Sequence, residues 1–181
     1  MRVAEKMLVL VTVALVITCG VGNAKSKGKE TMKKISVEEE GIIYTVPNGW
    51  EAKKDDKHEY KVVYGPKLDG FVQNIIVSDV EDEYSADKII GKNAKVAEVL
   101  GMMFLDVELL ENKEIVYNDT LKGVMSRLTY RMKDRYSRQS QYIIYDGKKC
   151  YKFVCSSLNV EGKNESNDKL FDDIIRSVKF K

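Results

Sequence analysis

The chain is poor in the residues that most often perform chemistry. It has one histidine, His58, together with 2 prolines and 3 cysteines in 181 residues. A Ser-His-Asp triad would have to use His58, and no Gly-x-Ser-x-Gly turn accompanies it. No glycine-rich phosphate loop or dinucleotide-binding fingerprint is present either. We therefore expect a protein that is not an enzyme, with no catalytic residue, no cofactor and no metal site.

The chain also lacks an excess of charge of either sign. It carries 30 Lys and Arg against 28 Asp and Glu, for a formal net charge of +2. The presumed leader holds Arg2, Glu5 and Lys6, so its removal leaves 28 basic and 27 acidic side chains. A balance so close to zero gives no electrostatic reason for binding nucleic acid, and we do not expect nucleic acid as a partner.

The apolar run near the N-terminus is too short for a transmembrane helix. Residues 7–18 read MLVLVTVALVIT, which is twelve residues, whereas about 20 are needed to cross the hydrocarbon core. A short apolar run after Arg2 and Lys6 is typical of a secretory signal peptide, although a buried N-terminal helix is an alternative. We predict that residues 1–19 are a signal peptide and that the protein is exported.

The end of this run resembles a bacterial lipoprotein signal, in which a small residue precedes a cysteine that receives lipid. Here Thr18 precedes Cys19, where Gly, Ala or Ser is usual, and Val16 replaces the commonest Leu. We predict lipidation of Cys19, since acyl chains contribute about 0.8 kcal/mol per buried methylene and anchor a protein to the membrane of the cell envelope. The alternative is cleavage after Ala24, which would leave a periplasmic or secreted protein.

A change of composition separates a tether from a domain. Residues 20–40 are polar and charged, without convincing periodicity, and this predicts a flexible tether. A tether of this length spans about 25 Å on average. We predict that residues 41–181 form one α+β domain.

Strand patterns dominate this domain. Stretches rich in β-branched and aromatic residues are separated by turn signals. The dipeptide Asp146-Gly147 predicts a tight hairpin between the last two of them. The predicted strands lie within residues 42–50, 59–65, 71–80, 113–118, 123–134, 138–147 and 149–157.

Two helices are predicted from caps and apolar spacing. Ser85 can cap a helix that begins near Ala86, and Ser166 or Asn167 can cap a final helix. Each helix has one apolar stripe, which we expect to pack on the sheet rather than to line a ligand site. The stripes are Ile89, Val96, Ala97, Leu100, Met103 and Phe104 in the first helix, and Leu170, Phe171, Ile174, Ile175 and Val178 in the second.

The strand within residues 123–134 predicts one drier and one wetter face. Leu128 and Tyr130 share the apolar face, whereas Arg127 and Thr129 share the other. Basic residues then gather near a predicted hairpin bend. They could bind an acidic protein or anionic lipid, or they could form a solvated edge that resists strand pairing. These candidate partner-binding residues are Arg131, Lys133, Arg135 and Arg138.

Three other candidates for chemistry have simpler explanations. Cys150 and Cys155 are five apart on one predicted strand, so they point to opposite faces and are badly placed to bridge. His58 lies in a predicted exposed turn without metal-binding partners. Residues 79–83, which include four acidic side chains, lack the glycine and spacing of a known calcium loop.

The order of elements and two end motifs resemble the PsbP-like superfamily. The first motif is GIIYTVPNGW, residues 41–50, and the second is FDDIIRSVKF, residues 171–180. The resemblance covers residues 41–181 and implies an α+β fold, with a central antiparallel sheet flanked by helices on both faces. The superfamily includes an extrinsic photosystem II subunit, a nuclear import factor and bacterial exported lipoproteins of unknown function. Its shared theme implies protein binding without catalysis, although a fold alone does not determine function.

Together these features predict a non-enzymatic, membrane-anchored envelope lipoprotein. We expect it to bind or support another, unidentified envelope protein. The alternative is a small-molecule or lipid carrier with a cavity between sheet and helix. A cryptic hydrolase is a third hypothesis.

Overall fold

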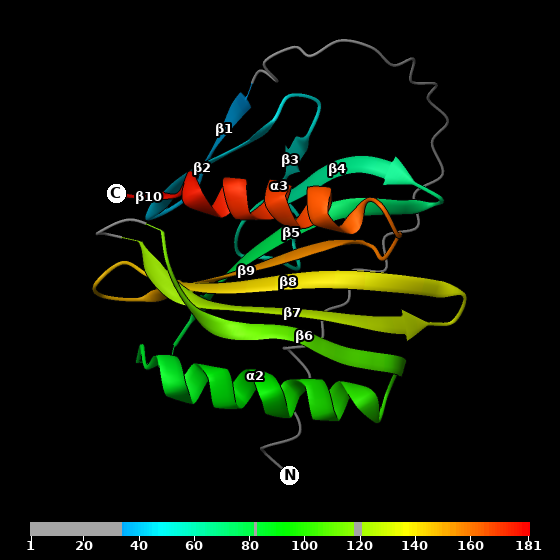
Figure 1. Cartoon of the computed structure of the whole chain (residues 1–181). Helices are drawn as coiled ribbons and strands as arrows, with labels where there is room; N and C mark the ends of the chain where they lie inside the picture. Colours follow the sequence, from blue (N-terminus) through cyan, green and yellow to red (C-terminus); the bar gives the residue numbers. More distant parts are fainter. Residues whose placement is uncertain (1–33, 82, 118–120) are drawn as a thin grey trace.

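The computed structural model describes residues 34–81, 83–117 and 121–181 (Figure 1). The predicted signal peptide, Cys19 and residues 20–33 of the predicted tether lie outside the described residues. Two helices and two antiparallel sheets make up the described part, which confirms the α+β class. The elements are β1 (Lys34–Glu38), β2 (Ile42–Pro47), β3 (Glu51–Lys53), β4 (Val62–Leu68), β5 (Phe71–Val80), α2 (Ala86–Gly101), β6 (Leu105–Val116), β7 (Lys122–Met132), β8 (Arg135–Tyr145), β9 (Cys150–Leu158), α3 (Asn164–Arg176) and β10 (Lys179–Phe180).

The smaller sheet has the strand order β1-β2-β10. Its first strand lies inside the predicted tether, so the prediction of a tether up to residue 40 is wrong for residues 34–38. Ile35 and Val37 pack against the core between polar neighbours. This period-two alternation is that of a half-buried strand, and the high charge of the surrounding segment masks it in the sequence.

The larger sheet has the order β3-β4-β5-β9-β8-β7-β6, and every neighbouring pair is antiparallel. The predicted hairpin between β8 and β9 is confirmed. Gly147 has a φ of 98°, and Asp146 Oδ1 accepts hydrogen bonds from the backbone N–H groups of Lys148 and Lys149. A positive φ of this kind is what a glycine tolerates without strain.

The Pro-Asn-Gly-Trp turn places the side chain of Trp50 in the core. Gly49 has a φ of 89°, and the N–H of Trp50 donates to the carbonyl of Pro47. The buried indole then packs against the backbone of Gly65 and lies edge-on to Phe171 of α3. This turn therefore connects β2 of the smaller sheet to β3 of the larger one, and the side chain of Trp50 anchors it in the core.

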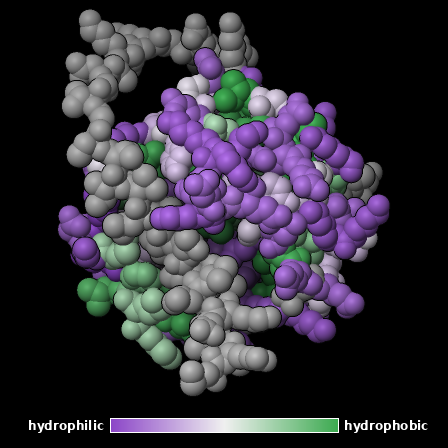
Figure 2. Space-filling view, turned by 180° about the vertical axis from the view of Figure 1, so that it is seen from behind, coloured by the Kyte–Doolittle hydropathy of each residue, from purple (hydrophilic) through white to green (hydrophobic). Residues whose placement is uncertain are grey.

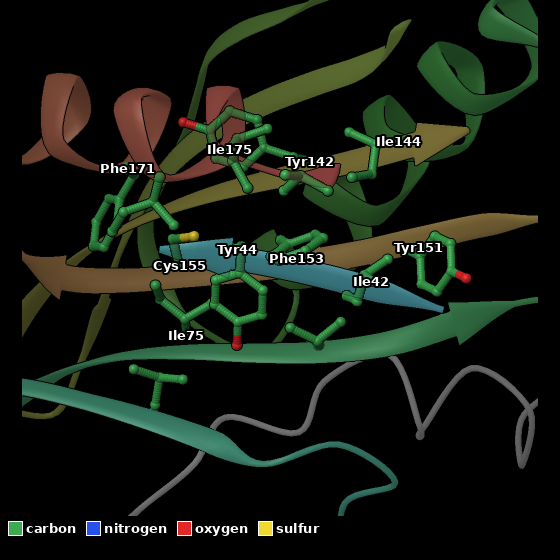
Figure 3. Close-up of a cluster of buried hydrophobic side chains, with 14 of the residues drawn as sticks. Ile42, Tyr44, Ile75, Tyr142, Ile144, Tyr151, Phe153, Cys155, Phe171 and Ile175 are labelled. Carbon is green, nitrogen blue, oxygen red and sulfur yellow. The ribbon is translucent and has the colours of Figure 1, made fainter. Parts of the chain in front are cut away.

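The main core lies where the smaller sheet, α3 and the larger sheet meet. Ile42 and Tyr44 of β2, Phe153 of β9, and Phe171 and Ile175 of α3 are almost completely buried. Figure 3 shows these side chains converging from the three elements. The ring of Tyr44 meets that of Phe153 edge-on at 5.4 Å between centroids, a favourable geometry for aromatic pairs.

Two smaller clusters of buried side chains connect α2 to the larger sheet. Ile89 packs with Val124 of β7, and Leu100 packs with Leu128 and Tyr130 of the same strand. The intervening residue Met125 belongs to the main core instead. Successive residues of β7 therefore serve different packing layers, as the pleat of a strand requires.

Several predictions about these elements need correction. Met103 lies beyond the end of α2 and is largely exposed, because the chain turns after Gly101. The final helix begins at Asn164, so Ser166 and Asn167 lie in its first turn and do not cap it. The predicted strand 113–118 is the end of the much longer β6.

The predicted wetter face of β7 is also wrong at its centre. Arg127 and Thr129 are both buried. Arg127 forms ion pairs with residues of α3, so the covered face carries charge where the sequence indicates exposure.

Candidate functional site

A cleft of about 470 Å³ lies beside α3. Its lining joins β6, β7 and β8 to the helix, which crosses the sheet in the upper part of Figure 1. Every lining side chain is charged, with five acidic and four basic groups. They are Glu111, Arg127, Arg138, Glu165, Asp168, Lys169, Asp172, Asp173 and Arg176.

Arg127 is the buried centre of this cleft, with only 5% of its surface exposed. Its Nε lies 3.1 Å from Asp168 and donates to Ser140 Oγ at 3.0 Å, and its Nη1 pairs with Glu111. Its Nη2 lies 3.6 Å from Asp172 and has no hydrogen-bond partner among the described residues. Burial alone would lower the pKa of Arg127, but the surrounding carboxylates, Asp168 foremost, keep it above its ordinary value.

The carboxylates of α3 have partners of their own. Arg138 binds Asp168 through two hydrogen bonds, of 2.9 and 2.6 Å. Asp172 accepts a hydrogen bond of 2.6 Å from the hydroxyl of Tyr142. Burial raises the pKa of Tyr142 well above its ordinary value, and the neighbouring charge of Asp172 adds to the effect.

This arrangement favours a clamp rather than proton transfer. Guanidinium and phenol groups form strong, charge-assisted hydrogen bonds with carboxylates. Asp168 and Asp172 thereby fix one side of α3 to β7 and β8. The sequence shows that the two aspartates are four positions apart, which places them on one face of the helix, but it does not show the arginines that they meet.

The structure divides the four predicted partner-binding residues. Arg131 is about half exposed, pairs with Asp106 at 2.8 Å and lies over the ring of Tyr136. Lys133 is exposed in the turn between β7 and β8, and Arg135 opens β8. Arg138 is only 13% exposed and belongs to the cleft through Asp168. Arg131, Lys133 and Arg135 thus lie around the bend of the hairpin, whereas Arg138 binds Asp168 of α3.

A group of exposed apolar side chains follows the edge of the larger sheet. Met102 and Met103 precede β6, and Leu105, Leu110 and Val116 belong to it. Met102 is 83% exposed, Leu105 66% and Val116 69%. Figure 2 shows hydrophobic side chains at the lower left of a surface that is otherwise mostly hydrophilic. We call these five residues the apolar edge.

Comparison with known proteins identifies the fold. No protein-family model and no curated protein matches the chain. A solved structure of cyanobacterial PsbP (CyanoP) from Synechocystis sp. PCC 6803 matches with a TM-score of 0.58 and 16% identity, over 89% of this chain and 99% of that one. The chain has a PsbP-like fold.

Two further solved structures agree with this assignment. LpqN, involved in cell envelope biogenesis of Mycobacterium tuberculosis, matches with a TM-score of 0.54 and 9% identity, over 83% of this chain and 92% of that one. A point mutant of the protein Mog1 matches with a TM-score of 0.54 and 11% identity, over 83% of this chain and 96% of that one. At such identities the likeness establishes the PsbP-like fold alone.

The PsbP-like domain buries both late cysteines. Cys150 belongs to the cluster beneath α2, whereas Cys155 belongs to the main core, so their predicted placement on opposite faces is confirmed. No disulfide joins them. Burial raises the pKa of the Cys155 thiol well above its ordinary value, which makes it unreactive.

The remaining candidates of the PsbP-like domain lie apart from the cleft. The side chain of His58 is only 12% exposed and lies 3.4 Å from Asp55, so the prediction of an exposed histidine is wrong. Asp79 accepts hydrogen bonds from Tyr60 and Lys149. Within residues 34–81, 83–117 and 121–181, no three His, Cys, Asp or Glu side chains are placed to hold a metal ion. No helix of the same residues is long and apolar enough to cross a membrane.

Proposed function

We propose that this chain is a non-enzymatic envelope lipoprotein whose PsbP-like domain binds another envelope protein. Cys19 carries the lipid anchor in this proposal, and the domain is exported. We infer further that α2 and α3 cover opposite faces of the larger sheet, as the alternation of contacts along β7 supports. The outer edge of the larger sheet, formed by β6, is then available to a partner.

The apolar edge is the observation that carries the proposal. Met102, Met103 and Leu105 lie close together at the start of β6. Large apolar side chains that are exposed together on a folded domain indicate a contact surface, because exposure of each costs free energy. Burying Met102, Leu105 and Val116 against a partner would remove this cost. The cleft beside α3 is less suited to this role, since its charges are largely satisfied within the chain.

The carrier alternative has weaker support. A lipid cavity between sheet and helix would need apolar space, whereas Tyr142, Phe153 and Phe171 fill the region beneath α3. The cleft that does lie there is lined by charged groups. LpqN, a protein of cell envelope biogenesis with the same fold, is consistent with an envelope role.

Site-specific crosslinking in cells tests the proposal. A photo-crosslinking residue at Leu105 or Val116 should capture one recurrent envelope protein, while the same residue at the exposed Lys57 should not. Failure to capture any protein from either edge position, despite good expression, would reject protein binding at the apolar edge. A lipid retained by the purified chain in native mass spectrometry would favour the carrier.

The anchor is tested separately by metabolic labelling with a radioactive fatty acid. The native chain should incorporate the label, and Cys19→Ala should not. Equal, background-level labelling of both chains would mean that Cys19 is not lipidated.

A further inference from the structure

β1 is an edge strand of the smaller sheet. Within the described part of the chain it pairs with β2 on one side only, near the top of Figure 1. The side chains of Ile35 and Val37 pack against the core. Those of Lys34, Ser36 and Glu38 are exposed. Because an edge strand can pair with a further extended chain, β1 is a candidate for strand addition.

The backbone of β1 directs alternate residues away from β2. The hairpin closes through the N–H of Glu39, which donates to the carbonyl of Ile42 at 3.0 Å. Since hydrogen-bonded pairs alternate along an antiparallel ladder, the odd-numbered residues of β1 bond to β2. The carbonyl of Glu38 agrees with this pattern, because it accepts a hydrogen bond of 3.2 Å from the side chain of Lys61. The backbone groups of residues 34, 36 and 38 therefore point outward.

The sequence of β1 is complementary in charge to a second copy of itself. The strand reads KISVE, with a lysine at one end, a glutamate at the other and Ser36 at the centre. A two-fold axis at Ser36 places Lys34 of each antiparallel copy opposite Glu38 of the other. Opposite charges stabilise cross-strand pairs, whereas a parallel pair in register would set like charges side by side. A self-complementary surface of this kind is what a two-fold interface requires.

Both charged side chains are available for this contact. Lys34 is exposed and forms no hydrogen bond or ion pair with the described residues. Glu38 lies 3.7 Å from Lys181, but its side chain is 66% exposed. Lys181 donates its hydrogen bond, of 3.0 Å, to the carbonyl of Glu39 instead. An exposed ion pair of this length contributes little, so it does not hold the carboxylate of Glu38 away from a second copy.

We propose that two copies of this chain associate through β1, in antiparallel orientation, with Ser36 on the two-fold axis. The two three-stranded smaller sheets then form one sheet of six strands. The N–H of Lys34 replaces Lys61 at the carbonyl of the partner's Glu38. Ile35 lies opposite the partner's Val37, which covers the part of Ile35 that the core leaves exposed. This inference goes beyond the proposed function, because it uses a different surface from the apolar edge.

Cysteine crosslinking of the full chain in detergent micelles tests the axis. In the proposed dimer Ser36→Cys faces itself at about 5.5 Å between Cα atoms, a separation that suits a disulfide. Mild oxidation should therefore yield about ten-fold more dimer than Lys57→Cys, an exposed control position between β3 and β4. The native chain measures the background from its own cysteines. Equal yields from the two variants would overturn the proposal.

Mixed variants test the antiparallel orientation. Lys34→Cys and Glu38→Cys should each give little dimer alone, because identical positions lie about 14 Å apart in the proposed pair. An equal mixture of the two variants should give the mixed disulfide. A higher yield from either variant alone than from the mixture would indicate a parallel pair and would overturn the proposal.

Exchange of the two charges tests why a second copy is selected. In the Ser36→Cys background, Lys34→Glu or Glu38→Lys should lower the dimer yield about three- to ten-fold at low salt, since each sets like charges opposite each other twice. Both changes in one chain restore opposite charges and should recover the yield. A double variant no better than the single variants would reject charge complementarity between two copies.

The two proposals fail in different ways. Capture of an envelope protein from Leu105 or Val116, without a Ser36→Cys dimer, would keep the proposed function and reject association through β1. A Ser36→Cys dimer without capture at the apolar edge would do the reverse.

Discussion

Arg127 and Lys152 are basic side chains near the middle of the larger sheet, but their surroundings differ. Arg127 lies beneath α3 among Asp168, Asp172 and Glu111, which keep its pKa above the ordinary value despite burial. Lys152 lies opposite Ile143, whose side chain packs with α2, and burial lowers its pKa to about 8. Ion pairs beneath α3 thus stabilise the charged form of Arg127, whereas burial on the side of α2 favours the neutral form of Lys152.

This difference shows what each helix contributes. Fixing α3 requires specific ion pairs in addition to its aromatic core, and each pair restricts how the helix lies on the sheet. The contacts of α2 are mainly aliphatic, so shape and volume determine its position. The layer beneath α3 should therefore be sensitive to loss of single charges, and the layer beneath α2 to loss of volume.

The largest effect is expected for Arg127→Met. Removal of the guanidinium leaves Asp172 without its buried cation and Asp168 with Arg138 alone. This should cost about 3–5 kcal/mol in the free energy of unfolding. Urea denaturation at pH 7 measures this. Arg131→Met makes the same change at an exposed pair with Asp106 and should cost less than about 1 kcal/mol. Similar losses in both variants would mean that the buried network contributes no more than a surface ion pair.

A somewhat smaller loss is expected for Leu128→Ala, the residue next to Arg127 on β7. Its side chain packs with Leu100 of α2, and the resulting cavity should cost about 2–4 kcal/mol. Because no charge changes, the loss should be the same at low and high salt. Leu110→Ala is the matched control on the exposed edge and should change stability little. A strong salt dependence for Leu128→Ala would contradict the aliphatic description of this layer.

Lys152→Met should increase stability at pH 7. The folded-state pKa of Lys152 is lowered from 10.5 to about 8, so the unfolded chain binds the proton more strongly between these values. The free energy of unfolding of the native chain should therefore rise with pH from about 8 towards 10. The destabilising contribution of Lys152 should be largest below pH 8. Denaturation across this range should show the slope in the native chain and a flatter profile in Lys152→Met. Identical slopes would mean that Lys152 is not the titrating group.

The smallest effect is expected for Glu111→Gln. The hydrogen bond from Lys113 is the largest cause that lowers the pKa of Glu111 below its ordinary value of 4.5, and Arg127 lowers it further. The stabilisation is thus complete above pH 4.5 and is lost as pH falls through the lowered value. Acid titration of the unfolding midpoint should be less steep in Glu111→Gln below pH 4.5. A steeper profile in the variant would contradict this sign.

The sequence predicts elements whose pattern is local. The Asp146-Gly147 hairpin, the placement of Cys150 and Cys155, and the buried faces of both helices follow from turn chemistry and periodicity. The end motifs also point correctly to the PsbP-like fold. Each of these features depends mainly on residues close together in the chain.

Features that depend on distant partners escape prediction. The local pattern predicts that Arg127 lies on a solvent-exposed face. The structure instead pairs it with Asp168 and Asp172 of α3, which lie about forty residues later in the chain. The local pattern also predicts a tether at residues 34–38, which form β1 because they pair with β2. Met103 fits the stripe of α2, but a turn after Gly101 removes it from the buried face. Long-range pairing or a change of chain direction decides these cases, and the local pattern does not carry that information.

Because Cys155 is buried, the rate at which its thiol is labelled would report how often the core opens. Its sulfur lies in the main core, between Tyr44 and Phe171 in Figure 3, with no exposed surface. An alkylating reagent can reach this thiol only after the core has opened. The labelling rate therefore depends on the opening of the core and not on collisions of the reagent with the closed surface. In an oxidising compartment the same delay keeps the thiol from exchanging with other proteins for as long as the domain stays closed.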